Sequence, residues 1–286
     1  MAIIPKVYLN SVVSIGVRDD ANKIHWIGTG FFVGRNSDEE GQIVPFLVSN
    51  KHVFKGKDTV IIRMQKKGCD ALEEVDYPLL NEDNSPRYVL HDMDDVDIAV
   101  LRINAQYIID NNLEFPYIDI DNNAMSSFEL RKNGAEEGSI VYMLGFPMGL
   151  VNVSSNNPIS RMGCVSRMSE AQINEQHNML IDIQNFPGNS GSPIITRPEF
   201  IAVGGSPSLQ KSVLVGIVHS YIPYQESLIN SQTKQVVEIR SENSGIANVH
   251  PVEYIRDIID KIYPIPNKTA VEPLQSQLTP QAEPEA

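Results

Sequence analysis

The chain has too few cysteines and too few basic residues for several large classes of protein. Its 286 residues include two cysteines, Cys69 and Cys164, which form no CxxC pair. We therefore predict neither a disulfide scaffold nor a metal site, and expect both thiols to be reduced core residues. With 23 basic and 36 acidic residues the formal charge is −13. This charge disfavours nucleic acid and anionic membranes as partners.

Long apolar runs are missing as well. The N-terminal stretch "MAIIPKVYLNSVVSIGV" is interrupted by Pro5, Lys6 and Asn10, so it fits neither a signal peptide nor a membrane span. We expect a cytoplasmic protein with no membrane partner, although a chain whose signal peptide had been removed would look the same. We predict no cofactor and no bound metal.

Helical patterns are scarce, and short β-rich runs dominate instead. Examples are "VPFLVSN", "DIAVLRI" and "SVLVGIVHSYI", separated by clusters of Gly, Asn, Asp and Pro. This pattern is typical of an all-β sandwich or barrel, and it disfavours a parallel α/β sheet. The polar stretches 65–95 and 104–139 are expected to be long loops or insertions.

One helix is predicted, from Pro251 to Tyr263. Four isoleucines at i, i+3, i+4 and i+7 give it one apolar face, and Pro264 ends it. Residues 264–286 are rich in Pro, Gln and Glu and have no hydrophobic period, so they are predicted to be a disordered tail.

The stretch "NFPGNSGSPII" sets Ser190 between glycines in a sharply bent segment. A serine hydroxyl is protonated at neutral pH, so a nucleophilic serine needs a base that a third group orients. Among six histidines, His52 ends the apolar strand "VPFLVSNKHVF" and would be rigidly placed. Asp97 stands at the threshold of "DIAVLRI", where its carboxylate could hold an imidazole. Taken singly, each residue also has an ordinary structural interpretation, in a turn or at a strand end.

The motifs "SNKHVF", "DIAVL" and "GNSGSP" occur in the order His, Asp, Ser. In them the chain resembles the trypsin-like (chymotrypsin-fold) serine peptidases, particularly V8-like and HtrA-like enzymes, over roughly residues 10–263. The resemblance implies an all-β fold of two antiparallel β-barrels with a C-terminal α-helix. The expected barrels are residues 1–112, with His52 and Asp97, and 113–250, with Ser190. The helix would span 251–263, before the tail.

The resemblance also implies a serine endopeptidase that cleaves protein or peptide substrates through an acyl-enzyme. Ser190 would be the nucleophile, His52 the base and Asp97 the group that orients His52. The N–H groups of Gly188 and Ser190 would form the oxyanion hole. Many secreted relatives carry an aspartate before the nucleophile, which pairs with a newly cut N-terminus. Because that position is Asn189 here, we predict that activity needs no N-terminal cleavage.

For substrate specificity, the family's spacing puts Gln184 near the floor of the S1 pocket, with His219, Ser220 and Tyr221 on its wall. Because Gln184 is not a carboxylate, a preference for Arg or Lys is disfavoured. His219 could recognise a glutamate side chain as in V8-like enzymes, but it lies one residue later than a simple match requires. The alternative is a strand residue that faces elsewhere.

A different class of function is a catalytically inactive trypsin-like fold that acts as a protein-binding module. The presence of all three residues of the triad disfavours it. An α/β-hydrolase esterase would need a GxSxG elbow, which "GNSGSP" does not provide. A protease inside cells also needs restraint, so a regulatory protein partner is plausible. The sequence leaves the oligomeric state open.

Overall fold

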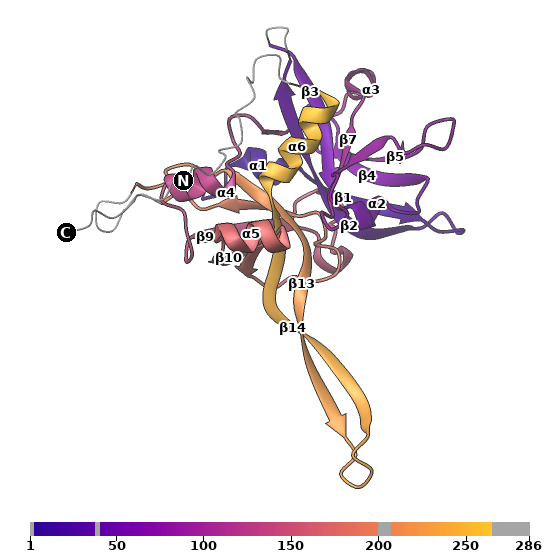
Figure 1. The fold of residues 1–286 in the computed structure, drawn as a ribbon. Helices are drawn as coiled ribbons and strands as arrows, with labels where there is room; N and C mark the ends of the chain where they lie inside the picture. The colour runs from indigo at the N-terminus through magenta and orange to yellow at the C-terminus, as the bar shows by residue number, and fades with distance from the viewer. Residues whose placement is uncertain (1–2, 38–40, 200–206, 265–286) are drawn as a thin grey trace, which may run out of the picture.

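The structure, a computed structural model, describes residues 3–37, 41–199 and 207–264. Strands dominate it, and they form two β-units that lie against each other (Figure 1). The prediction of an all-β fold of chymotrypsin type with a C-terminal helix is confirmed. The predicted tail lies outside the described residues, except for Pro264.

The N-terminal unit is an eight-stranded sheet in the order β5-β4-β1-β2-β3-β7-β6, with β8 paired to β2. All pairs are antiparallel except β2 with β8. Its strands are β1 (Val12–Arg18), β2 (Ile24–Asn36), β3 (Ile43–Ser49), β4 (Thr59–Gln65), β5 (Leu72–Pro78), β6 (Tyr88–Leu90), β7 (Ala99–Arg102) and β8 (Ile118–Asp119).

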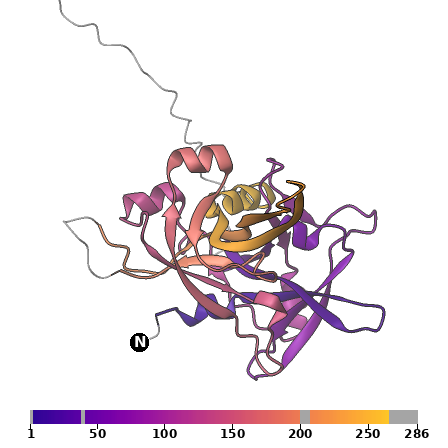
Figure 2. The same cartoon turned by 90° about the horizontal axis from the view of Figure 1, so that it is seen from below.

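The C-terminal unit is a closed barrel in the order β10-β11-β14-β13-β12-β9. Its strands are β9 (Ile140–Gly145), β10 (Ile159–Arg167), β11 (Met179–Asp182), β12 (Pro193–Thr196), β13 (Leu214–Ile229) and β14 (Val236–Pro251). Figure 2 places the helices α4 (Ser127–Lys132) and α5 (Glu170–Gln176) on the outside of this unit, away from the N-terminal sheet.

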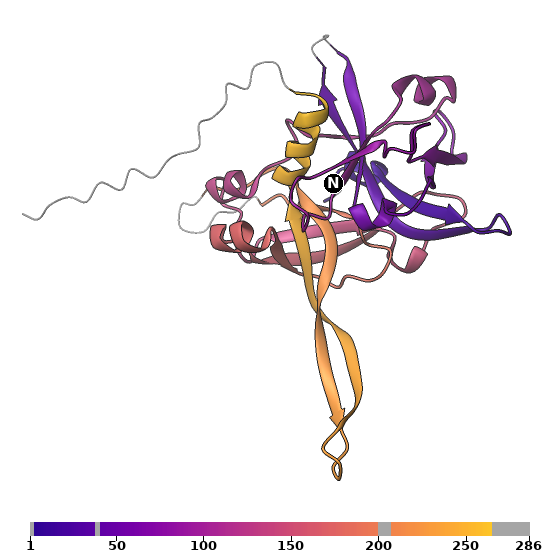
Figure 3. The ribbon, with the colours of Figure 1, turned by 45° about the vertical axis from the view of Figure 1, so that its right-hand side comes forward.

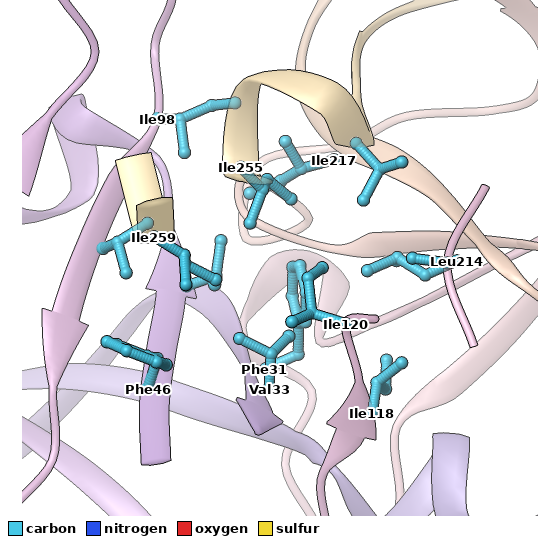
Figure 4. Close-up of a cluster of buried hydrophobic side chains, with 14 of the residues drawn as sticks. Phe31, Val33, Phe46, Ile98, Ile118, Ile120, Leu214, Ile217, Ile255 and Ile259 are labelled. Atoms are coloured by element: carbon cyan, nitrogen blue, oxygen red, sulfur yellow. The ribbon is translucent and has the colours of Figure 1, made fainter. Parts of the chain in front are cut away.

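The predicted C-terminal helix is present as α6 (Val252–Ile262), directly after β14. Its apolar face enters a cluster of buried side chains that both units share, where Ile255 and Ile259 meet Phe31 and Ile217 (Figure 4). This core joins the two units and so sets how their loops face each other. The buried Arg35 of β2 adds ion pairs to Asp121, at 3.2 Å, and to Asp260 of α6.

Two expectations were wrong. The stretches 65–95 and 104–139 are not long loops, because they contain β5, β6, α3 (Ala105–Asp110), β8 and α4. The two helices are marked in the sequence by capping residues and not by a long hydrophobic repeat. Asn104 caps α3, and Ser126 with Glu129 forms a capping box on α4. Three short elements, α1 (Lys6–Asn10), α2 (Lys51–Phe54) and the 3₁₀ turn η1 (Pro147–Gly149), complete the fold.

The cysteines are both free, but neither belongs to the core. Cys69 is exposed in the turn between β4 and β5, and Cys164 is half-buried on β10. The turn that carries Cys69 lies at the surface, so its thiol is exposed although it is apolar. Among the described residues, no helix is long and apolar enough to cross a membrane.

The outer parts of β13 and β14 leave the barrel as a long two-stranded arm (Figures 1 and 3). On the body, β12 pairs with β13 only as far as Ile217, and β11 pairs with β14 from Ile246 to Val249. Beyond those pairs, from Pro223 to the turn at its tip, the arm's two strands pair with each other alone among the described residues.

Candidate active site

His52 and Asp97 meet at the end of β3. The strand stops at Ser49, and Asn50 begins the short helix α2, which carries His52. Asn50 donates a hydrogen bond from Nδ2 to the Asp97 carbonyl oxygen, at 2.7 Å. The Asp97 carboxylate accepts two more: from the His52 N–H, at 3.0 Å, and from His52 Nδ1, at 2.5 Å. One aspartate thus fixes both the backbone and the ring of this histidine.

These contacts decide which nitrogen of His52 can accept a proton. Because Asp97 can only accept, Nδ1 carries the hydrogen and Nε2 is left as the basic atom. Burial raises the pKa of the Asp97 carboxyl, but the hydrogen bonds and charge of His52 outweigh this, and the pKa lies below the ordinary value. The carboxylate is therefore ionised at neutral pH, and can stabilise a protonated imidazole.

The turn around Ser190 depends on its two glycines. Gly188 and Gly191 have φ of +95° and +89°, in the left-handed region that favours glycine. A Cβ at Gly188 would lie 2.5 Å from the Phe146 carbonyl oxygen, and one at Gly191 only 1.9 Å from that of Thr29. Both conformation and space therefore exclude side chains on either side of the Asn189–Ser190 pair.

Thr29 of β2 holds this turn. Its hydroxyl donates to the Gly188 carbonyl oxygen at 2.7 Å, and its N–H donates to the Ser190 carbonyl oxygen at 2.8 Å. The N–H groups of Gly188 and Ser190 donate to no acceptor within residues 3–37, 41–199 and 207–264. Two N–H groups left free by neighbouring residues of one turn could stabilise a developing oxyanion.

The structure brings the His52 and Ser190 segments together around β2. A Cβ at Gly28 would contact Val53 at 2.9 Å and the Ser190 carbonyl oxygen at 3.4 Å. The residue after His52 and the backbone of Ser190 thus lie beside the same glycine. Within the described part of the chain, the Ser190 hydroxyl makes no hydrogen bond, and so is not bonded to His52. Such bonds are often long before substrate binds.

Behind Asp97 lie His250 and His177, which sequence reasoning did not assign to the site, together with His219, which it placed on the S1 wall. The Asp97 N–H donates to His250 Nε2 at 2.9 Å, and His250 Nδ1 donates to the His177 carbonyl oxygen at 2.7 Å. The ring of His219 stacks on His250, with centroids 4.0 Å apart, and its Nε2 contacts Asn178 Oδ1 at 2.7 Å. No local pattern pointed to His250, which lies near the end of β14.

The proposed S1 residues lie along β13 and the segment before the nucleophile turn. Asn185, which sequence reasoning missed, donates from Nδ2 to the Ser220 carbonyl oxygen at 3.0 Å and accepts from Asn243 Nδ2. Gln184 lies beside Gly245 of β14, and Tyr221 is partly exposed where the arm begins. This links the nucleophile turn to the base of the arm.

His219 cannot supply a positive charge at neutral pH. Burial and the neighbouring His250 lower the pKa of His219 to about 3. Its ring stacks on His250, and the charges of Asp97 and His52 also act on its pKa, so the ring lies near the triad. A neutral ring offers no positive charge to a glutamate side chain, which favours the alternative of a strand residue that faces elsewhere. Within the described ranges, no group of three or more His, Cys, Asp or Glu side chains could hold a metal ion.

Asn189 points away from solvent. It is almost fully buried, and its Nδ2 has no hydrogen-bond partner among the described residues. Gly145 of β9 packs against it, because a Cβ there would lie 2.9 Å from Asn189 Oδ1 and 2.0 Å from the buried Ser192 Oγ. A carboxylate at position 189 would be an unpaired buried charge. Burying the neutral amide of Asn189 costs less free energy.

A family model and several solved structures match this chain. The family model described as the trypsin-like peptidase domain matches residues 28–204. No curated protein sequence matches the chain. Among solved structures, the HtrA-type protease AlgW with decapeptide is similar at 16% identity and a TM-score of 0.46, covering 90% of this chain. The chain covers 66% of AlgW's length.

A second solved structure is the MamO protease domain from Magnetospirillum magneticum in its apo form. It is 12% identical with a TM-score of 0.44, and the match covers 88% of this chain and 96% of that one.

Proposed function

Since the chain belongs to the trypsin-like peptidase family, we propose that it is an active serine endopeptidase whose triad is Ser190, His52 and Asp97. One observation carries the proposal: Asp97 orients the imidazole of His52 on the segment that packs beside the Ser190 turn. An ionised carboxylate behind a histidine and a glycine-flanked serine together supply a nucleophile, a base and its orienting group.

In the proposed mechanism, the Ser190 Oγ attacks the peptide carbonyl carbon as His52 Nε2 takes its proton. The negative charge that develops on the carbonyl oxygen is stabilised by the N–H groups of Gly188 and Ser190, each worth about 3 kcal/mol. The imidazolium, stabilised by Asp97, then protonates the leaving amine. Water then attacks the acyl-enzyme while His52 takes its proton, and His52 returns a proton to the Ser190 oxygen as the acyl group leaves.

Labelling with a fluorophosphonate tests this mechanism without knowledge of the substrate. We expect the wild-type chain to be labelled and Ser190→Ala not to be. Ser192→Ala is the matched control, because this buried serine lies two residues away in the same turn. Equal labelling of wild type and Ser190→Ala would refute the assignment. A wild-type chain that is never labelled would favour the inactive, protein-binding alternative.

We also propose that activity does not require a new N-terminus. The buried, neutral Asn189 supports this, because it offers no carboxylate for an N-terminal amine. A variant with extra residues before Met1 should be labelled at the wild-type rate, and complete loss of labelling would count against the proposal. The cytoplasmic location, the regulatory partner and the lack of nucleic-acid and membrane partners stay predictions.

A further inference from the structure

The arm formed by β13 and β14 is short of hydrogen-bond partners. An isolated two-stranded hairpin is only marginally stable in water, and a third strand or a packed face stabilises it. In the described part of the chain, nothing pairs with the outer edge of either arm strand from Pro223 to the tip. The edges thus present backbone donors and acceptors that another chain could use.

The direction of the N–H groups along β13 follows from the tip of the arm. The N–H of Asn230 donates to the Gln235 carbonyl oxygen at 2.9 Å, so in the arm, from Tyr224 to Asn230, even-numbered residues point their N–H groups toward β14. The register shift between Leu228 and Ile229 adds its extra residue to β14, so the alternation along this part of β13 is unbroken. Pro223 fits, because an odd position needs no N–H for β14. Gln225 and Ser227 therefore point theirs to the open edge.

The two faces of the arm differ in charge. Side chains that are paired across the strands lie on the same face. One face is uncharged and carries Gln225, Ser227, Ile229, Ile239 and Ser241. The other face is acidic in balance and carries Tyr224, Glu226, Leu228, Glu238, Arg240 and Glu242. A strand added to the edge would place alternate side chains over these two faces.

The open edge of β13 continues directly from the candidate active site. Beside the nucleophile turn, the Gly191 N–H donates to the Val218 carbonyl oxygen at 3.0 Å, and the Val218 N–H donates to that of Ser192 at 2.9 Å. A chain that pairs antiparallel to β13 would run along the arm toward this turn in its own N-to-C direction. From Pro223 to Ile229, the arm edge of β13 could align about seven residues over roughly 23 Å.

We propose that the arm edge of β13 from Pro223 to Ile229, beyond the residues assigned to the S1 pocket, binds an extended segment of the polypeptide substrate as an added antiparallel strand. This segment lies N-terminal to the bond that is cleaved. Because one arm face is uncharged and the other acidic, the segment that fits alternates β-branched apolar residues with basic ones. The orientation rests on the proposed function, whereas the docking itself requires no cleavage.

The test uses the full chain with Ser190→Ala and a fluorescent peptide of about twelve residues that alternates Val and Lys. Fluorescence anisotropy should show binding, and hydrogen exchange should slow along β13 but not along β14. Adding Ser227→Pro removes one open-edge N–H and should weaken binding about tenfold, as expected for one backbone hydrogen bond. The matched control Ser241→Pro acts on the other edge, because Ser241 pairs with Gln225, and should change the affinity by less than about twofold.

A second measurement holds even if proline disturbs the arm. N-methylation of the alternate peptide residues that face β13 should abolish binding, whereas methylation of the other set should leave it. A photo-crosslinker at the peptide's C-terminal end should label residues 185–191. Equal effects of the two proline variants, equal binding of a Val–Glu peptide, crosslinks at the arm tip, or a dimer that Ser227→Pro dissociates would each overturn the proposal.

This experiment separates the two proposals. Edge-specific binding with no fluorophosphonate labelling of Ser190 would refute the peptidase and leave a docking strand. Labelling of Ser190 without edge-specific binding would refute the docking strand and leave the peptidase.

Discussion

Lowering the pH from 7 to 5 should destabilise the fold through the two stacked histidines behind Asp97, His219 and His250. His219 has a folded-state pKa of about 3, against 6.5 for the free side chain. The unfolded chain therefore binds a proton on this residue at a pH at which the folded chain does not. The stability that the neutral ring contributes is fully present above pH 6.5, and is lost as the pH falls toward 3.

The magnitude follows from the two pKa values. At pH 5 the side chain of His219 is almost fully protonated in the unfolded chain and almost neutral in the folded one. This residue therefore lowers the free energy of unfolding by about 2 kcal/mol relative to neutral pH. Burial lowers the pKa of His250 as well, against smaller opposing effects led by its hydrogen bond to His177, so His250 acts in the same direction. Together, His219 and His250 should therefore lower the free energy of unfolding by more than His219 does alone.

The assay is urea unfolding at pH 7 and pH 5 for wild type and His219→Phe. The phenyl ring keeps a surface for stacking on His250 but cannot titrate. We expect the wild-type chain to lose about 2 kcal/mol more than the variant between the two pH values. Ser220→Ala, next to His219 on β13, removes one hydrogen bond from Asn248 of β14 and should keep the wild-type pH dependence. Equal losses for wild type and His219→Phe would refute the reasoning.

Three further predictions concern the site and its support. Asp97→Asn should slow fluorophosphonate labelling about 10⁴-fold by favouring the wrong tautomer of His52; an unchanged rate in a folded variant would refute this role. Gly28→Ala should slow labelling about 100-fold by displacing Val53; labelling at the wild-type rate in a folded variant would count against it. Arg35→Met should lower the free energy of unfolding by about 3 kcal/mol, measured in urea, because it leaves two carboxylates without their shared cation; a stabilised variant would contradict this.

The parts of the fold that were predicted correctly rest on local patterns. The alternating runs indicated strands, and the isoleucines of α6 indicated a helix with one buried face, because burial of apolar residues follows the period of each element. The elements that were missed, α3 and α4, are short and depend on caps such as Asn104 and Ser126. Cys69 was assigned to the core because its chemistry is apolar, but the turn that carries it lies at the surface.

By itself, the sequence determined the chemistry that is available: a serine between two glycines, a histidine after an apolar strand and an aspartate before another. Only the tertiary structure decided which side chains meet. It joined His52 to Asp97 and stacked His219 on His250, because residues far apart in the chain come together only when the two units share one core. It also left β13 with an open edge along the arm. A local pattern indicates a strand, but not how many neighbours that strand will find.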